Sequence, residues 1–250
     1  MLRSASMIQG LFTIHAVDGD IGRVDQFYFD DEEWIVRYVV VDITPWREGK
    51  YVLITPTDVI ATNWEEKTID VALTTEQVRN SPDVDQHQPV SRRHETQYGD
   101  YYGWPYYWAH GGLWGPGYQS SSQMMDSAKA AAQEHTSETL PSNEPGDLHL
   151  RSTREVIGYH LEALDGPIGH IEDFLMDDDT WAIQYLVIDT RNWWYGKTVL
   201  ISPGSIKRLD WAKARVYVDL PRARINNAAE LERITTAKEG AQHSVPAQLR

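Results

Sequence analysis

Acidic side chains form the densest polar clusters in this sequence. Asp30, Asp31, Glu32 and Glu33 are consecutive, and residues 177–179 are three consecutive aspartates. Clustered carboxylates could ligate Ca²⁺ or Mg²⁺, but a cation loop also needs a turn glycine and a distal bidentate acid, and neither run has them at the required spacing. We therefore expect two solvated turns and predict no metal site.

Histidine and cysteine usage gives no sign of catalysis. His15, His110, His160 and His170 are scattered, and none forms the i, i+4 arrangement with Glu that a metallohydrolase helix needs. The chain has no cysteine, which excludes thiolate nucleophiles, disulfides and cysteine-bound metals. Because no nucleophile, base and oxyanion donor come together in the sequence, we predict that the protein is not an enzyme and has no catalytic residues and no cofactor.

The overall charge disfavours several partners. The chain has 37 acidic and 23 basic side chains and a formal charge of −14, with no local cluster of Lys and Arg. Phosphate backbones and anionic membranes would be repelled, so nucleic acid is a poor candidate partner. No window approaches the roughly 20 apolar residues of a membrane span, and residues 1–20 lack the apolar run of a signal peptide. We expect a cytoplasmic protein without membrane insertion.

Nearly the same nine residues occur twice, as "EGKYVLITP" at 48–56 and "YGKTVLISP" at 195–203. With an offset of 147, residues 14–80 align with residues 161–227 without a gap. One residue of slippage also aligns the two "LRS" segments, at 2–4 and 150–152. We conclude that the chain contains a duplication. The aligned identities include Gly22 with Gly169, Phe27 with Phe174, Trp34 with Trp181, Tyr38 with Tyr185, Asp42 with Asp189, Lys50 with Lys197, and Trp64 with Trp211.

Each copy reads as a series of short strands. Alternating segments such as "IGRVDQFYF" and β-branched segments such as "WIVRYVVVDI" are separated by Asp-Gly and acidic turn signals. Strands this close together, with no helical period between them, favour a small antiparallel barrel or sandwich. A single helical turn could follow each copy, in "TTEQVRN" and "PRARINN", the first with Thr as its cap.

The order of these motifs is similar to that of the PRC-barrel family, and it occurs twice. The motifs are LRS…G, D-G-x-I-G-x-[VI], F-x-x-D-D, W-x-[IV]-x-Y-[LV]-V-[VI]-D and G-K-x-V-L-I-[ST]-P. The resemblance implies two small antiparallel β-barrels, like the cytoplasmic domain of the photosynthetic reaction centre H subunit and the C-terminal domain of a ribosome-maturation factor. Both of those domains serve as interaction platforms, so the resemblance implies binding and no catalysis.

The remaining segments have a different composition. Residues 98–119 contain nine Tyr and Trp residues among Gly and Pro, a composition that resists regular helices and strands. These rings could fold back on a barrel, fill the groove between the copies, or bind another protein; base stacking would also need a basic groove. A polar, Pro- and Ser-rich stretch follows, and residues 227–240 could form a C-terminal helix.

Taken together, the sequence predicts an all-β protein of two PRC-like barrels joined by a largely irregular aromatic linker, with a possible C-terminal helix. The expected boundaries are 1–83 for barrel 1, 84–148 for the linker, 149–227 for barrel 2 and 228–250 for a helical or disordered tail.

We expect a non-catalytic scaffold that binds a protein partner through loop and linker aromatics, with a homodimer or intramolecular pairing of the barrels possible on the same surface. The alternatives are a soluble accessory of a photosynthetic or other membrane electron-transfer complex, and a ribosome or RNA maturation factor. The candidate partner contacts are Trp46, Trp104, Tyr106, Tyr107, Trp108, Trp193, Trp194 and Tyr195.

Two further pairs have open roles. Trp64 and Trp211 could cover the cores or bind a partner. Asp42 and Lys50, with their counterparts in the second copy, could pair across a hairpin, make local backbone bonds, or form a site at the strand ends.

Overall fold

The computed structural model describes residues 1–44, 49–84, 90, 92–104, 150–190 and 198–226. The chain divides into two compact units. Unit 1 takes its described residues from Met1, 3–154 and 177–182, and unit 2 takes them from Leu2, 155–176 and 183–226. Each unit therefore contains residues from both copies of the duplication.

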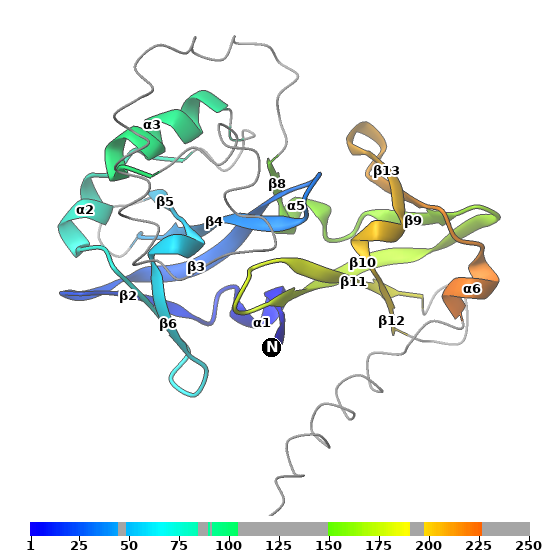
Figure 1. Ribbon diagram of the computed structural model, residues 1–250, viewed down its shortest axis with the longest axis horizontal. Helices are drawn as coiled ribbons and strands as arrows, with labels where there is room; N and C mark the ends of the chain where they lie inside the picture. The colour runs from blue at the N-terminus through cyan, green and yellow to red at the C-terminus, as the bar shows by residue number, and fades with distance from the viewer. Residues whose placement is uncertain (45–48, 85–89, 91, 105–149, 191–197, 227–250) are drawn as a thin grey trace, which may run out of the picture. The chain divides into compact units, whose positions relative to one another are not determined.

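Unit 1 is built on a seven-stranded sheet with the order β5-β4-β3-β2-β7-β6, and β8 pairs with β3 outside this path (Figure 1). Hairpins connect β2 to β3, β3 to β4, β4 to β5 and β6 to β7 in antiparallel pairs. Its strands are β2 (Thr13–Ala16), β3 (Gly19–Asp30), β4 (Ile35–Asp42), β5 (Tyr51–Ile54), β6 (Val59–Asn63), β7 (Thr68–Val71) and β8 (Leu150–Ser152). Its helices are α1 (Ala5–Ile8), η1 (Pro56–Asp58), α2 (Thr75–Asn80) and α3 (Arg92–Tyr102).

Unit 2 repeats this plan with the order β12-β11-β10-β9-β14-β13, and β1 (Leu2–Ser4) pairs with β10. Its strands are β9 (His160–Ala163), β10 (Gly166–Asp177), β11 (Ile183–Asp189), β12 (Thr198–Ile201), β13 (Ile206–Asp210) and β14 (Arg215–Val218). Its helices are α5 (Thr153–Val156), whose first two residues belong to unit 1, η2 (Pro203–Ser205), η3 (Trp211–Lys213) and α6 (Arg222–Asn226).

The two sheets match strand for strand. β5 and β12 occupy the same end of their sheets, and Val41 pairs with Val52 in unit 1 as Ile188 pairs with Val199 in unit 2. The chain is thus mostly β, consistent with the all-β class that the sequence predicts. Each sheet is an open path in which, among the described residues, no pairing joins the two end strands.

One pair of neighbouring strands in each sheet is parallel, which the prediction of antiparallel sheets missed. β2 lies parallel to β7, and β9 lies parallel to β14. The chain returns to β2 only after four intervening strands, and the direction of such a long-range pairing is not encoded in the alternation of any one strand.

The acidic runs are turns, as predicted. Asp30 accepts through Oδ1 from the backbone N–H groups two and three residues later at 3.0 and 3.1 Å, and Asp177 does the same at 3.2 and 3.0 Å. Each turn ends at a tryptophan, Trp34 or Trp181, held in the left-handed region at φ 59°. The short helices α2 and α6 also form where the sequence predicts them, and Thr74 caps α2 with a complete capping box.

Two other expectations have different outcomes. The linker contains one helix among the described residues, α3, and residues 98–102 of this helix belong to the stretch 98–119 that we expected to resist helix formation. The possible C-terminal helix over residues 227–240 lies outside the described residues. Among the described residues, no helix is long and apolar enough to cross a membrane.

Candidate interaction surface

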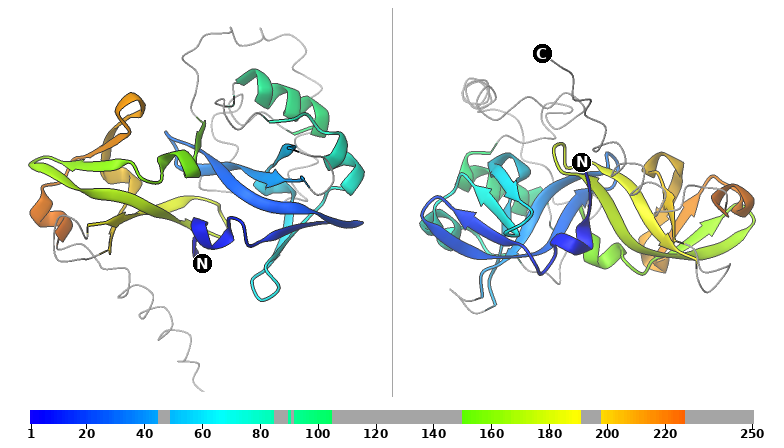
Figure 2. Two further views of the ribbon diagram at one scale, coloured as in Figure 1. Left: turned by 180° about the vertical axis from the view of Figure 1, so that it is seen from behind. Right: turned by 90° about the horizontal axis from the view of Figure 1, so that it is seen from below.

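Helix α3 covers one face of the unit 1 sheet, over β3, β4 and β5 (Figures 1 and 2). Tyr98 and Tyr102 are one helical turn apart, so they lie on the same side of α3. Arg92 forms an ion pair with Glu95 at 2.9 Å within the first turn of α3, and Glu95 is itself buried. Helix α3 therefore packs on the sheet through its tyrosines, and Arg92 neutralises the buried carboxylate of Glu95.

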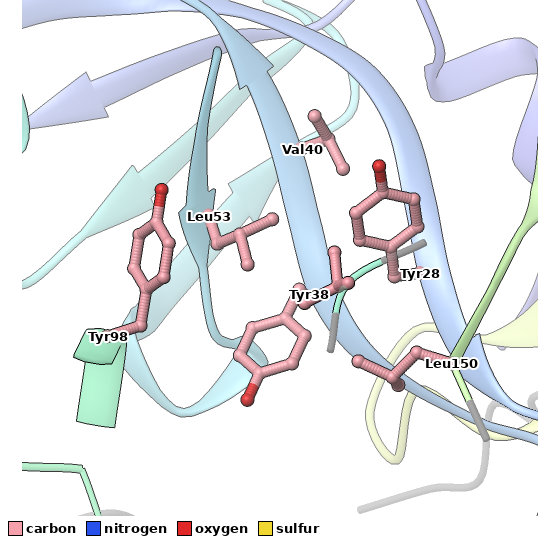
Figure 3. Close-up of a cluster of buried hydrophobic side chains, with 7 residues drawn as sticks. Tyr28, Tyr38, Val40, Leu53, Tyr98 and Leu150 are labelled. Carbon is pink, nitrogen blue, oxygen red and sulfur yellow. The ribbon is translucent and has the colours of Figure 1, made fainter. Parts of the chain in front are cut away.

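The contact between α3 and the sheet is an aromatic-rich cluster, shown in Figure 3. Tyr98 is only 1% exposed and lies beside Leu53 of β5, with Tyr38 and Tyr28 across the face. Burying each large apolar side chain contributes about 1.5–3 kcal/mol, so this cluster is a substantial part of the attachment of α3. Its buried members are Tyr28, Tyr38, Val40, Leu53, Val90, Tyr98 and Leu150.

Trp104 follows α3 and extends the cluster. Its ring stacks on Tyr102 with 4.3 Å between centroids and 14° between planes, and its backbone N–H donates to Gly99 at 2.9 Å. Its indole also donates a hydrogen bond to the carboxylate of Asp58 at the end of η1. The structure thus places Trp104, one of the predicted partner contacts, against unit 1 itself.

Asp58, in η1, has a strongly perturbed carboxyl group. Burial raises the pKa of Asp58 to about 7, and hydrogen bonds from Thr55 and Trp104 only partly offset this effect. Burial also raises the pKa values of Tyr98 and Tyr102 well above their usual range, so both rings stay neutral under α3. The Asp58 carboxyl therefore titrates near neutral pH, and it lies beside Trp104.

Unit 2 has a corresponding face. Leu175, Tyr185, Val187 and Leu200 form one cluster at the positions of Tyr28, Tyr38, Val40 and Leu53. Three of the four are buried, Tyr185 is half-buried, and Ser205 replaces Asp58. Among the described residues of unit 2, no helix corresponds to α3.

The other predicted contact residues are not placed. Trp46, Tyr106, Tyr107, Trp108, Trp193, Trp194 and Tyr195 all lie outside the described residues, as does His110. The remaining paired tryptophans do lie against their own units. Trp64 packs edge-on against Phe12 at 5.1 Å, and Trp211 packs against Tyr159 at 5.9 Å, which supports their role as covers of the cores.

Asp42 and Lys50 do not form a site together. Lys50 Nζ donates to the carbonyl oxygens of Arg79 and Ser81 at 2.8 and 2.7 Å, and it forms an ion pair with Asp83 at 3.1 Å. A cation at the last carbonyls of α2 is favourable because those groups carry partial negative charge. Asp42 instead accepts from the backbone N–H of Thr44 at 2.8 Å, so local backbone bonds are the correct alternative in the first copy.

The acidic and histidine groups have structural partners. Asp177, Asp178 and Asp179 approach closely enough to hold a cation, but Arg3 Nε already donates to Asp178 at 2.9 Å and the amino group of Met1 contacts the same carboxylate. His15 is exposed and lies 2.7 Å from Asp20, whose hydrogen bond raises the pKa of His15. Neither arrangement adds a reaction site.

Comparison with known proteins does not identify a family. No protein-family model matches the chain, and no curated protein matches it in sequence. The resemblance to PRC barrels therefore stays a prediction from the sequence motifs.

Proposed function

We propose that the chain is a non-catalytic protein-binding scaffold built from two PRC-like barrels, and that the α3-equivalent face of unit 2 is its docking site. The observation that carries this proposal is the relation between the two sheets. One sheet face holds an aromatic helix of its own chain, and the matching positions of the other sheet form an apolar cluster of the same kind.

The binding mode follows from what α3 does on unit 1. Two tyrosines one turn apart insert toward β4 and β5, and the following tryptophan closes the stack. Leu175 stands in place of Tyr28, so an anchor on the unit 2 face would meet an aliphatic side chain at that position. The expected ligand is an amphipathic helix with aromatic anchors at i and i+4.

Charge adds a second requirement on the partner. The chain has a net charge of −14, which favours approach of a helix with Lys or Arg beside its aromatic face. Ser205 in place of Asp58 removes the carboxylate that holds Trp104 in unit 1. The unit 2 face therefore relies on apolar contact more than the unit 1 face does.

A peptide of residues 92–104 of this chain is a suitable probe, because its anchors are known from unit 1. We expect this peptide to shift the amide NMR signals of Leu175, Val187 and Leu200 in the full-length protein. Tyr98→Ala with Tyr102→Ala in the peptide should abolish those shifts. Signals that stay unmoved with the wild-type peptide, or that still shift when the peptide has lost both tyrosines, contradict the proposal.

A further inference from the structure

Residues 150–154 begin the second copy in sequence, yet they belong to unit 1. β8 pairs antiparallel with β3, with Tyr28 opposite Ser152 and Asp30 opposite Leu150 (Figure 1). β4 lies along the other edge of this part of β3, and β2 pairs only with residues 19–23. β8 therefore fills the edge that β2 leaves open.

Thr153 is the most deeply held residue of this segment, at 1% exposure. Its Oγ1 accepts from the backbone N–H of Phe27 at 3.1 Å and from Gln9 Nε2 at 2.7 Å, and it donates to the carbonyl oxygen of Phe27 at 3.3 Å. These three hydrogen bonds select a hydroxyl side chain at this position, because an apolar side chain of the same size would leave buried polar groups unpaired. These partner groups belong to β3 and to the segment after α1.

The arginines on either side of Thr153 each meet an acid of the first copy. Arg151 Nε lies 3.0 Å from Asp31 Oδ2, with both side chains mostly buried. Arg154 Nη2 lies 2.6 Å from Asp25 Oδ1 and 3.1 Å from the carbonyl oxygen of Asp25. These two acids give the edge of β3 a charge pattern that matches the segment.

The remaining two positions complete the contact. The Ser152 hydroxyl bonds the side chain of Gln26, and Leu150 is buried in the aromatic cluster beneath α3. All five residues of the segment thus have a matched partner in unit 1. Backbone pairing provides the affinity in such an added strand, and the side-chain contacts provide the specificity.

We propose that this edge of β3 is a strand-acceptor site that recognises residues 150–154 independently of the chain that carries them, and so accepts the same segment from a second copy of this chain. Residues 105–149 join the segment to its own unit 1. Such a tether gives an effective concentration of about millimolar, so the segment of the same chain occupies the edge at micromolar protein. Exchange between copies becomes visible once the tether is cut.

The test uses the full chain with a protease site inserted within residues 120–130. One preparation also carries an affinity tag on the part of the chain before this site. A tagged preparation and an untagged, ¹⁵N-labelled preparation are both cut, mixed and captured on the tag. We expect labelled C-terminal fragments in the capture, approaching half of the bound C-terminal fragment at equal mixing. The same mixture before cutting should yield none.

Variants assign the exchange to the segment. Thr153→Val should lower the captured labelled fragment about tenfold or more. Arg154→Ala changes a more exposed side chain and should lower it less, while Arg215→Ala, on an exposed pair within unit 2, should leave it unchanged. Circular dichroism before cutting checks that each variant is folded. Absence of labelled fragment in the wild-type capture, or equal capture with folded Thr153→Val and Arg154→Ala, overturns the proposal.

Discussion

Arg151 donates from Nε to Oδ2 of Asp31 across 3.0 Å, joining the start of the second copy to the acidic turn of the first. Arg3 repeats this bond with Asp178 across 2.9 Å, and all four residues belong to unit 1. The first arginine of each copy therefore bonds the second aspartate of the turn in the other copy. The acidic runs serve as turns and as anchors for these arginines.

Replacing Arg151 should destabilise unit 1. Arg151→Met leaves a mostly buried Asp31 carboxylate without its cation, at an expected loss of about 1–3 kcal/mol in the free energy of unfolding. Arg215→Met is the matched control, because Arg215 pairs with Glu162 at 2.7 Å with a much more exposed guanidinium. That change should cost less than about 1 kcal/mol. Urea unfolding measures both, and equal losses would contradict a special role for the Arg151–Asp31 pair.

Asp58→Asn should change how stability depends on pH. The pKa of Asp58 is raised to about 7 from 3.8, so the folded state holds the proton more tightly than the unfolded chain. The free energy of unfolding therefore falls as pH rises between those two values, and the loss is complete above pH 7. Asp58→Asn cannot ionise and should be more stable than the wild type at pH 8, with the gap closing toward pH 4.

Asp18→Asn is the control of opposite sign. The backbone N–H of Thr75 bonds Asp18 at 2.7 Å and lowers the pKa of this exposed carboxyl. The stability that Asp18 contributes is present at neutral pH and is lost as pH falls. The free energy of unfolding of Asp18→Asn at pH 8 should therefore not exceed that of the wild type. Thermal unfolding from pH 4 to pH 8 compares the variants. A wild-type curve parallel to that of Asp58→Asn throughout would refute a titrating Asp58.

Removing Tyr98 should release α3 from the sheet. Truncating an aromatic side chain that is 1% exposed costs about 3–5 kcal/mol. The amides of α3 should then exchange hydrogen much faster, while those of β4 change less, because the sheet keeps its own pairing. Tyr101→Ala removes a ring of the same helix that is 41% exposed and packs edge-on against Tyr102, so its effect should be smaller than that of Tyr98→Ala. Similar exchange in α3 for both variants would mean that the Tyr98 cluster does not hold the helix.

Two equivalent glycines should be equally intolerant of a side chain. A Cβ at Gly22 would overlap the carbonyl oxygen of Asp42, and a Cβ at Gly169 would overlap that of Asp189. Gly22→Ala and Gly169→Ala should therefore each lower stability by more than about 1 kcal/mol. At Gly204 the nearest atom would be 3.9 Å away, so Gly204→Ala should be tolerated. Thermal melts of the three variants measure these changes in stability. An alanine that is tolerated at only one of Gly22 and Gly169 would contradict the claim that the two sites are structurally equivalent.

The sheets could be predicted because their signals are local. Asp-Gly turns, β-branched strands and the two acidic runs each fix a few neighbouring residues, and the duplication shows the pattern twice. These features need no knowledge of distant contacts.

The rest depends on long-range contacts that the sequence does not encode locally. The buried side of α3 consists of tyrosines around Gly99, so its helical period is weak; the i, i+4 spacing of Tyr98 and Tyr102 is the one signal that could have revealed it. The pKa of Asp58 is raised because folding buries its carboxyl group, and its hydrogen-bond partner Trp104 is far along the chain. The two "LRS" segments could not show which sheet each one joins, because their sequences are identical.

The central claim is that one β unit was copied and that both copies keep the same strand order and register. Cross-strand NMR contacts test it most directly, between Val41 and Val52 and between Ile188 and Val199. We predict nuclear Overhauser effects of similar strength for both pairs in the full-length protein. Contacts for one pair without the other, or a register shifted by one residue in either sheet, would contradict the claim.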